Sequence, residues 1–523
     1  MSAIKTALRF LRSPLSAESY HPMKSVLLIA VLSTASSAFA LDGQINIHDP
    51  STVTECDGKY YTFGTGGGGL ISDDGWTWRS GAVRPGGGVA PDVIHIGDRY
   101  IVSYAGTGVH TMWTKTLDTN SPGFGYQDDT VVATGDLDCN AIDPAFLLDP
   151  TDGKLWMTYG SYIGYIRLVE LDPKTGKRVD TNAQPVNVAI NCEASDMIFH
   201  DGWYYLLATH GSCCQGAASG YNIRCGRSRK VTGPFVDNMG IDMLQGGGTL
   251  VCGSEGRQVG AGHFGLVDLG DSVQKFSFHY EADLDRGGAS VLAILPLLWQ
   301  DGWPVAGENF SAGTYEIESA RTGTALGLAV EGMPVGGARR GGGRGAGGTN
   351  SLAGPRGGRG PNDTNAVAGR GNRRGGGGGM FAGQGGVIPP QDVAVVSTNW
   401  PTGNIDLRMG NYLCEAQEKW TITAVTNAGG YLGSPYFKIT IAGTDRALAA
   451  TPDAELVSLP AFTGAPEQLW RIDQLTDGTW RIMPKSVPNS KEPLALSAIG
   501  SSFATLAKFD PKSDRQRWHF KKP

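Results

Sequence analysis

The sequence has no strong excess of charge of either sign and few stretches of helix-forming residues. Only 18% of its 523 residues are charged, and the formal net charge is -6, which argues against a general affinity for nucleic acid or anionic membranes. The 77 Gly and 28 Pro provide many turns, and 17 Tyr and 12 Trp suit strands. The composition therefore favours an all-β chain, and the length favours at least two domains.

Long apolar runs are also missing. The stretch that follows Met23 is too short and too rich in serine to span a bilayer. It has a basic start at Lys24 and ends in the small-x-small pattern Ala38-Phe39-Ala40, which is typical of a cleaved signal peptide rather than of a buried helix. We therefore expect residues 1–40 to be a signal peptide, with 1–22 an extended n-region or a misassigned start. The mature protein would be secreted or periplasmic.

The cysteines show no zinc-site spacing. Seven of the eight fall before residue 260 and Cys414 stands alone, so complete pairing within each part of the chain is not possible. The adjacent pair Cys213-Cys214 leaves two interpretations open. Both are buried thiols, or one of them forms a bridge to a distant partner.

A repeated pattern occupies the first 300 residues. A polar residue in a kinked context, a tight turn with Asp and Gly, and aromatic or β-branched residues recur five times, with the heads of the units at Asp49, Asp92, Asp143, Glu193 and His263. A period of about 40 to 50 residues with several strands per unit is what a β-propeller needs. We predict a five-bladed β-propeller over residues 41–305, in which the unit heads meet around the central axis.

The C-terminal part has a different repeat. Trp420, Trp470 and Trp518 are each followed by alternating strand residues, which predicts a β-trefoil over 306–523 with the three indoles in its core. Residues 338–379 are rich in Arg and Gly and contain little that could pack, so we predict a disordered insertion there.

Four of the five unit heads carry carboxyl groups, and three of these are candidates for catalysis, without a nearby lysine or nucleophilic serine or cysteine. Asp49, Asp143 and Glu193 would converge in one cleft and suit acid and base chemistry on a neutral substrate. Glycoside hydrolysis needs one protonated and one ionised carboxyl group, and a third acid can orient the proton donor. Asp92, in "APD", is predicted to be structural.

The motifs "HDPS", "NAIDP", "EAS", "CCQGAASGYNIRCGRS" and "GAGH" together resemble glycoside hydrolase family 43 and, within it, the endo-1,5-α-L-arabinanases. The resemblance implies an inverting enzyme with Asp49 as general base, Glu193 as general acid, and Asp143 orienting Glu193 and tuning its pKa. It also implies sugar contacts from Asn140 and Ser161, and a metal, commonly calcium, beside His263 on the axis.

The tryptophan repeat resembles the ricin-type lectin fold, in which Gln-x-Trp marks each lobe. Gln468-Leu469-Trp470 and Gln516-Arg517-Trp518 match, whereas Gln417-Glu418-Lys419-Trp420 is one residue too long. A carbohydrate-binding trefoil is the expectation.

The sequence departs from the family after Glu193, where Ser195 replaces the usual proline and Asp196 adds a carboxylate. Three alternatives therefore stay open: an α-L-arabinofuranosidase, a β-xylosidase, or a carbohydrate-binding protein without turnover. The expected partner is arabinan or a related plant polysaccharide. We expect no nucleic acid or membrane partner and a monomeric protein.

Overall fold

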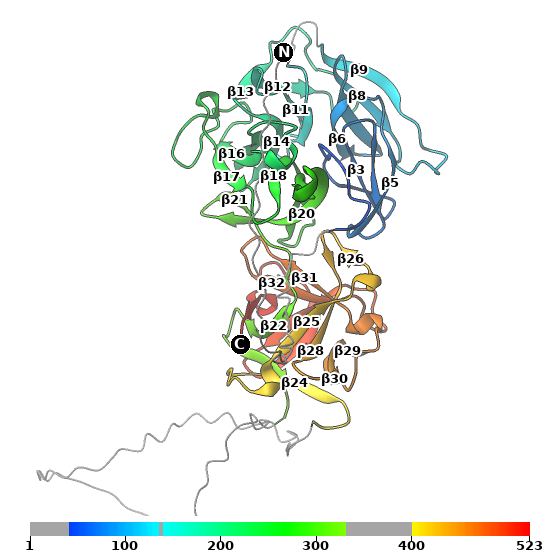
Figure 1. Cartoon of the computed structure of the whole chain (residues 1–523), viewed down its shortest axis with the longest axis vertical. Helices are drawn as coiled ribbons and strands as arrows, with labels where there is room; N and C mark the ends of the chain where they lie inside the picture. The colour runs from blue at the N-terminus through cyan, green and yellow to red at the C-terminus, as the bar shows by residue number, and fades with distance from the viewer. Residues whose placement is uncertain (1–40, 135–139, 331–399) are drawn as a thin grey trace, which may run out of the picture. The chain divides into compact units, whose positions relative to one another are not determined.

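The computed structural model describes residues 41–134, 140–330 and 400–523. The predicted signal peptide and the Arg- and Gly-rich segment 338–379 lie outside the described residues. Figure 1 shows strands in two groups along the chain, one from blue to green and one from green to red. They form a propeller and a second β domain.

The propeller consists of five antiparallel sheets, each containing four successive strands, with a short fifth strand, β1, paired in parallel to the first sheet. The strands, sheet by sheet, are β1 (Asp42–Gly43), β2 (Thr54–Cys56), β3 (Lys59–Phe63), β4 (Gly68–Ser72) and β5 (Thr77–Val83); β6 (Val89–Ile96), β7 (Arg99–Ala105), β8 (Gly108–Thr114) and β9 (Gln127–Thr134); β10 (Ala145–Leu148), β11 (Leu155–Tyr159), β12 (Tyr165–Leu171) and β13 (Val186–Ile190); β14 (Glu193–His200), β15 (Trp203–His210), β16 (Asn222–Ser228) and β17 (Thr249–Cys252); β18 (Val259–Asp268), β19 (Gln274–Ala282), β20 (Ala289–Gln300) and β21 (Trp303–Ala306).

Asp-Gly turns connect several of these strands. At Asp57-Gly58, Asp201-Gly202 and Asp301-Gly302 both residues have positive φ angles, between 48° and 75°. Two consecutive left-handed residues make the tight hairpin turn that matches the twist of the flanking strands, and Asp followed by Gly is well suited to it. The turn signals in the sequence thus fall where the hairpins lie.

The propeller ring is closed by the segment between β1 and β2. Ile47 donates its backbone N–H to Ser290 at 3.1 Å, and Leu292 of β20 donates to Ile45 at 2.9 Å. A buried cluster between the first and last sheets includes Trp76 and Leu292, and further clusters fill the other spaces between neighbouring sheets. Because no sheet can bury both faces alone, this stacking supplies the core.

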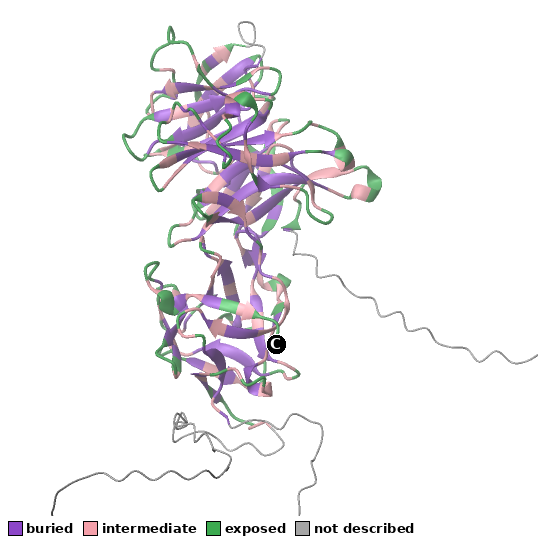
Figure 2. Cartoon of the chain, turned by 90° about the vertical axis from the view of Figure 1, so that its left-hand side faces the viewer, coloured by how far each residue is buried: buried purple, intermediate pink, exposed green. Residues whose placement is uncertain are grey.

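The first strands of successive sheets contact one another, from β2 to β6, β10, β14 and β18. This arrangement confirms the predicted five-bladed propeller and brings the beginnings of the five units together. Figure 2 shows buried residues following the strands, while exposed residues gather in the connecting loops.

The C-terminal domain is β-trefoil-like, in agreement with the predicted fold class. Most of its strands join in one sheet of ten, and two hairpins complete it. The strands are β22 (Gly313–Ser319), β23 (Ala325–Leu328), β24 (Ile405–Gly410), β25 (Trp420–Ala424), β26 (Gly430–Tyr431), β27 (Ser434–Pro435), β28 (Phe437–Ile441), β29 (Ala447–Ala450), β30 (Leu456–Leu459), β31 (Trp470–Gln474), β32 (Trp480–Pro484), β33 (Leu494–Ile499), β34 (Phe503–Lys508) and β35 (Trp518–Lys521).

The three repeated tryptophans are fully buried in one core cluster, as predicted. Each indole N–H donates to a backbone carbonyl, Trp420 to Leu326 at 2.7 Å, Trp470 to Leu448 at 3.1 Å and Trp518 to Leu496 at 3.0 Å. Because three equivalent residues make three equivalent bonds, the repeat in the sequence corresponds to a repeat in the packing.

Glu418 corrects the reading of the first lobe. The buried Gln468 accepts the backbone N–H of Thr463 at 2.7 Å. In the first lobe the residue two positions before the tryptophan is Glu418, whose carboxylate accepts the backbone N–H groups of Leu413 at 2.8 Å and Glu415 at 3.2 Å. The motif there is Glu-x-Trp and is not one residue too long.

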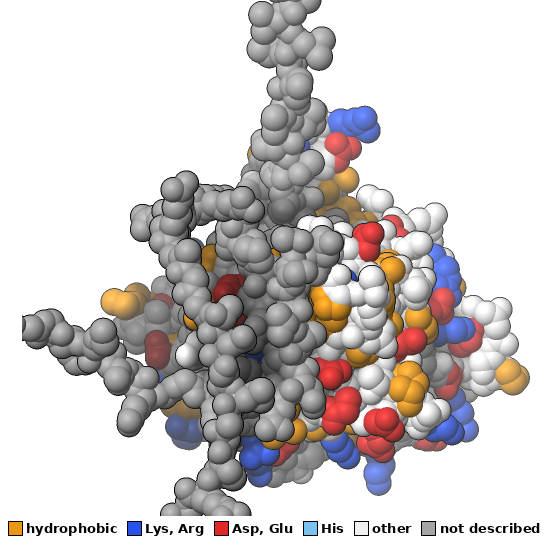
Figure 3. Space-filling model, turned by 90° about the horizontal axis from the view of Figure 1, so that it is seen from below, with side chains coloured by type: hydrophobic (Ala, Val, Ile, Leu, Met, Phe, Trp, Pro, Cys, Tyr) orange, Lys and Arg blue, Asp and Glu red, His pale blue; other side chains and the backbone are white. Residues whose placement is uncertain are grey.

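The described surface mixes both signs of charge. On the face in Figure 3, acidic and basic side chains are interspersed wherever grey atoms do not cover them. Among the described residues, no helix has the length and apolar character needed to cross a membrane.

Candidate active site

Five residues at the beginnings of the propeller units have left-handed backbone conformations. They are Asp49, Ala90, Asp143, Ala194 and His263, with φ angles from 46° to 64°. Such angles are uncommon outside glycine, and their recurrence shows that each unit makes the same kink. The equivalent residues in units two and four are therefore alanines, not the predicted heads Asp92 and Glu193.

Asp49 is surrounded by polar groups. Thr65 Oγ1 donates to Asp49 Oδ2 at 2.6 Å and accepts the backbone N–H of Ala90 at 3.0 Å. Three imidazoles face the other oxygen, Oδ1: His48 Nε2 lies 3.5 Å away, His263 Nδ1 3.6 Å and His279 Nδ1 3.9 Å. The threonine hydroxyl therefore fixes the position of the carboxylate, while the histidines lie where they can influence its pKa.

The histidines hold Asp49 in its ionised form. Burial raises the pKa of Asp49. The hydrogen bond and the positive charge of His263, followed by the charges of His279 and His48, lower it by more, and they hold the pKa of Asp49 well below its usual range. His279 accepts the backbone N–H of Asp49 at 3.2 Å, and burial lowers the pKa of His279 to about 3. A neutral His279 and an ionised Asp49 are thus the states at neutral pH.

Glu193 has the opposite charge preference. Its side chain is buried, and Tyr221 Oη donates a hydrogen bond to Glu193 Oε1. Burial raises the pKa of Glu193 to about 7; the tyrosine hydrogen bond opposes this rise and the negative charge of Asp49 adds to it. Two carboxyl groups with separated pKa values are the arrangement that acid and base catalysis needs.

Asp143 is buried and contacts the peptide next to Glu193. Its Oδ2 accepts the backbone N–H of Ala194 at 3.1 Å. Burial, with the charge of Asp49 as the next cause, raises the pKa of Asp143 to about 8, so it is mostly protonated at neutral pH. The negative charge that raises the pKa of Glu193 is that of Asp49. Asp143 instead holds the backbone next to Glu193 through its hydrogen bond to Ala194.

Asn140 and Ser161, the two residues for which sugar contacts were predicted, lie together and contact each other. Asn140 Oδ1 accepts the backbone N–H of Ser161 at 2.6 Å and its hydroxyl at 2.8 Å, while Asn140 Nδ2 donates to the carbonyl of Tyr165. Both side chains are buried. Their observed contacts hold a loop of the third blade, and the predicted sugar contacts stay predictions.

Cys213 and Cys214 are joined to each other by a disulfide, so both earlier interpretations of this pair were wrong. Cys213 is half-buried and Cys214 is exposed. Cys213 Sγ lies 3.9 Å from His48 Nε2, beside the Asp49 group. The described free cysteines are the buried Cys56, Cys192, Cys225 and Cys252 and the exposed Cys414.

Several site residues were missed from the sequence. His48 and Tyr221 stand within quoted motifs but attracted no role, because a lone histidine or tyrosine carries little signal. Thr65 and His279 lie outside the unit heads, and only the folded arrangement brings them to Asp49.

Three residues at this site offer donor atoms for a metal ion: His48, Asp49 and His279. The sulfurs of Cys213 and Cys214 also lie near His48, but a disulfide has no thiolate to bind a metal. The predicted metal neighbour, His263, is not in this group, and its Nδ1 lies 3.6 Å from Asp49 Oδ1.

Comparison with known proteins agrees with this geometry. The family described as "Glycosyl hydrolases family 43" matches residues 61–304. The extracellular endo-alpha-(1->5)-L-arabinanase 1 of Bacillus subtilis is 30% identical over 312 residues, which cover 53% of this chain and 93% of the relative. The chain belongs to glycosyl hydrolase family 43. As a family 43 member it is a glycoside hydrolase.

Other family 43 relatives differ in the activity that their names give. The extracellular exo-alpha-(1->5)-L-arabinofuranosidase ArbA of Cellvibrio japonicus is 31% identical over 333 residues, covering 55% of this chain and 93% of the relative. A solved structure of an exo-1,5-alpha-L-arabinanase from a bovine ruminal metagenomic library is 30% identical, with a TM-score of 0.47, and covers 52% of this chain and 100% of that chain.

Proposed function

We propose that this family 43 enzyme cleaves α-1,5-linked L-arabinan with inversion of the anomeric centre. The observation that carries the proposal is the charge difference between two neighbouring carboxyl groups. Asp49 has a pKa well below its usual range and Glu193 a pKa of about 7. One group is ready to accept a proton and the other to donate one.

In this mechanism Asp49 removes a proton from the attacking water, and Glu193 protonates the departing glycosidic oxygen. Thr65 keeps the carboxylate of Asp49 in place. Asp143 holds the peptide of Ala194 and so fixes the direction of the neighbouring Glu193. Inversion predicts that the first-formed sugar from an α-linked substrate is the β anomer, which early proton NMR spectra detect.

The substrate assignment rests on the relatives, whose names refer to α-1,5-linked arabinan or arabinose. Incubation with debranched arabinan, branched arabinan and arabinoxylan, followed by sizing of the products, tests it. Cleavage of debranched arabinan is the expected result. Activity on arabinoxylan alone would replace the proposal with the α-L-arabinofuranosidase alternative if arabinose is released, or with the β-xylosidase alternative if xylose is released.

An exo-acting arabinofuranosidase is the second candidate, because one relative of similar identity carries that name. The same chromatogram separates the two. An endo enzyme produces a ladder of oligosaccharides at early times, whereas an exo enzyme releases only the smallest product.

Substitution of the two carboxyl groups tests turnover itself. Asp49→Asn and Glu193→Gln should each lower kcat by several orders of magnitude, since each removes a proton-transfer group. Thermal unfolding of both variants should stay close to that of the native protein. Near-normal kcat in either variant would remove the role assigned to that residue, whereas a native protein that binds arabinan but releases no product would support the alternative of a carbohydrate-binding protein without turnover.

The remaining features follow from the polymer substrate. The β-trefoil-like domain binds carbohydrate, and residues 1–40 direct export, in keeping with relatives named extracellular. The protein has no nucleic acid or membrane partner, because its net charge is only -6. A monomer stays the expected state.

A metal ion beside His263 also belongs to this proposal. Calcium takes six to eight oxygen ligands, whereas the side chains nearest to His263 Nδ1 offer one carboxylate, Asp49, and ring nitrogens. These residues suit a calcium ion only if water supplies most of its ligands. Bound there, the ion would add positive charge near the base, and no step above depends on it.

A further inference from the structure

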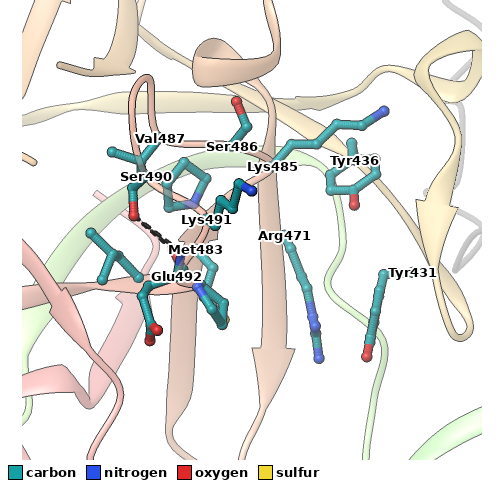
Figure 4. Close-up of a pocket in the computed structure, with 13 residues that line it drawn as sticks. Tyr431, Tyr436, Arg471, Met483, Lys485, Ser486, Val487, Ser490, Lys491 and Glu492 are labelled. Atoms are coloured by element: carbon teal, nitrogen blue, oxygen red, sulfur yellow. Dashed lines mark hydrogen bonds between the residues drawn. The ribbon is translucent and has the colours of Figure 1, made fainter. Parts of the chain in front are cut away.

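A cavity of about 390 Å³ lies in the β-trefoil-like domain and contains none of the residues around Asp49. Its walls come from the hairpin that begins with β26, from β31 and from the segment between β32 and β33 (Figure 4). The polar and aromatic residues that line it are Tyr431, Tyr436, Arg471, Lys485, Lys491 and Glu492. This size is within the range of small-ligand pockets.

Arg471 forms a rigid part of the wall. Its guanidinium carbon lies 3.3 Å from the centre of the Tyr431 ring, and its Nε lies 2.6 Å from Asp473 Oδ2. Figure 4 shows Arg471 and Tyr431 side by side. A guanidinium that is stacked and paired in this way loses little freedom when a ligand binds.

Behind this wall, cations and carboxylates form one network. The buried Asp473 contacts three cations: Arg471, Arg481 with Nη2 at 2.9 Å, and Lys275 with Nζ at 3.9 Å. Asp271, 3.7 Å from Arg481, and Asp74, whose carboxylate accepts the backbone N–H of Gly430 at 2.9 Å, offset the other two charges. The uncompensated positive charge at the cavity therefore comes from its rim.

The rim adds two more cations. Lys485 Nζ donates to the carbonyl of Ala428 at 2.8 Å and lies 4.6 Å from the ring centre of Tyr436. Lys491 is exposed and makes no ion pair with a described residue. The acid on the wall, Glu492, lies 3.9 Å from Lys508 Nζ, which already balances part of its charge.

We propose that this cavity binds an anionic saccharide, with the carboxylate of a uronate unit held by the rim lysines Lys485 and Lys491. The side chains of Tyr431 and Tyr436 line the same cavity and bring hydroxyl groups that can hydrogen-bond to a sugar. A neutral saccharide would leave the cationic side chains without a counter-charge, whereas a carboxylate accepts charge-assisted hydrogen bonds from them. The site would hold the enzyme on an acidic polysaccharide, and the proposal does not depend on the arabinan assignment.

The test compares an anionic oligosaccharide with its uncharged ester and with two control ligands. Isothermal titration of the full chain uses oligogalacturonate, the same oligomer with its carboxyl groups methyl-esterified, a neutral arabinan oligosaccharide and inorganic phosphate. We expect binding of the free acid, and affinity at least about tenfold lower for the ester, because charge-assisted hydrogen bonds are lost. The affinity for the free acid should also fall with added salt.

A pair of matched variants locates the binding. Lys485→Gln with Lys491→Gln should weaken oligogalacturonate binding at least about tenfold. Lys512→Gln with Lys522→Gln removes the same charge from exposed positions elsewhere and should bind like the native protein. Equal thermal unfolding of the two double variants confirms that both are folded.

Four results would overturn the proposal. They are no binding of oligogalacturonate, equal binding of the acid and the ester, full binding by the Lys485/Lys491 variant, and displacement by phosphate at the concentration of the oligosaccharide, which would indicate a general anion site. Because binding is measured without turnover, failure of the arabinan assay would leave these results unchanged.

Discussion

Removal of the Tyr221 hydroxyl should move the alkaline limit of activity. Tyr221 Oη donates to Glu193 Oε1, and this hydrogen bond opposes the rise of the Glu193 pKa to about 7. Glu193 must be protonated to donate, so activity is present below its pKa and is lost as the pH rises through it. In Tyr221→Phe the ionised carboxylate loses its donor, and the pKa should therefore rise.

The size of the shift follows from the difference between two hydrogen bonds. A hydrogen bond to a charged group contributes roughly 1.5 to 3 kcal/mol, and one between neutral groups roughly 0.5 to 1.5 kcal/mol. A difference of about 1.4 kcal/mol corresponds to about one pKa unit. The alkaline limb of kcat/KM should then move up by about one pH unit. At pH about 8 the protonated fraction of Glu193 would rise from about one tenth to about one half.

The assay is the pH dependence of kcat/KM on debranched arabinan, with each profile normalised to its own maximum. Tyr126→Phe is the matched control, because Tyr126 Oη donates to the carbonyl of Val83 in another part of the propeller. Its profile should coincide with that of the native enzyme. An alkaline limb in Tyr221→Phe that stays in place or moves down would refute the assignment of Glu193 as the acid.

Three further predictions concern other residues. Asp143→Asn should keep the alkaline limb of kcat/KM within about half a pH unit of that of the native enzyme, since the negative charge that raises the Glu193 pKa is that of Asp49. A shift of this limb to much lower pH would show that Asp143 tunes the pKa of Glu193. Glu418→Ala should lower the free energy of unfolding by about 1 to 3 kcal/mol, because two backbone N–H groups lose their acceptor, whereas Glu418→Gln should cost less than half of that by urea denaturation. Elemental analysis should find calcium in the native protein and much less in His263→Ala, and equal content in both would remove His263 from the metal site.

The propeller could be predicted because each blade repeats the same physical requirement. A strand, an Asp-Gly turn and an aromatic strand recur at blade length, and the hairpins at Asp57-Gly58 and Asp201-Gly202 have the backbone angles that this dipeptide favours. The tryptophan repeat was readable for a similar reason, since three equivalent core positions need the same large side chain.

The environment of Asp49 could not be predicted in the same way. Thr65 and His279 come from outside the unit heads, and His279 is 230 positions away in the sequence. The backbone contact itself repeats, since Thr65, Thr209 and His279 accept the N–H groups of the left-handed residues Ala90, His263 and Asp49. Residue type differs among the three acceptors, however, so the sequence period does not reveal them. The disulfide between Cys213 and Cys214 is likewise local to one loop, and the sequence signal of a cysteine pair does not distinguish it from two thiols.

The acids near the axis fall into two sets according to their sequence position relative to the left-handed residue of each unit. Asp49 and Asp143 occupy that position and meet at the site, whereas Asp92 and Asp196 come two residues after Ala90 and Ala194. Asp92 accepts the backbone N–H groups of Thr52 and Phe146 at 3.2 and 2.9 Å, and Asp196 accepts that of Met197 at 2.7 Å.

Thr52, Phe146 and Met197 each follow the left-handed residue of their own unit by three positions. The second set of acids therefore binds the backbone of inner strands and stays buried, with burial raising the pKa values of both Asp92 and Asp196. Position relative to the kink, rather than residue type, thus decides whether an acid on this axis belongs to the site or to the frame that holds it. The extra carboxylate of Asp196, which in the sequence looked like a change to the catalytic motif, belongs to the frame.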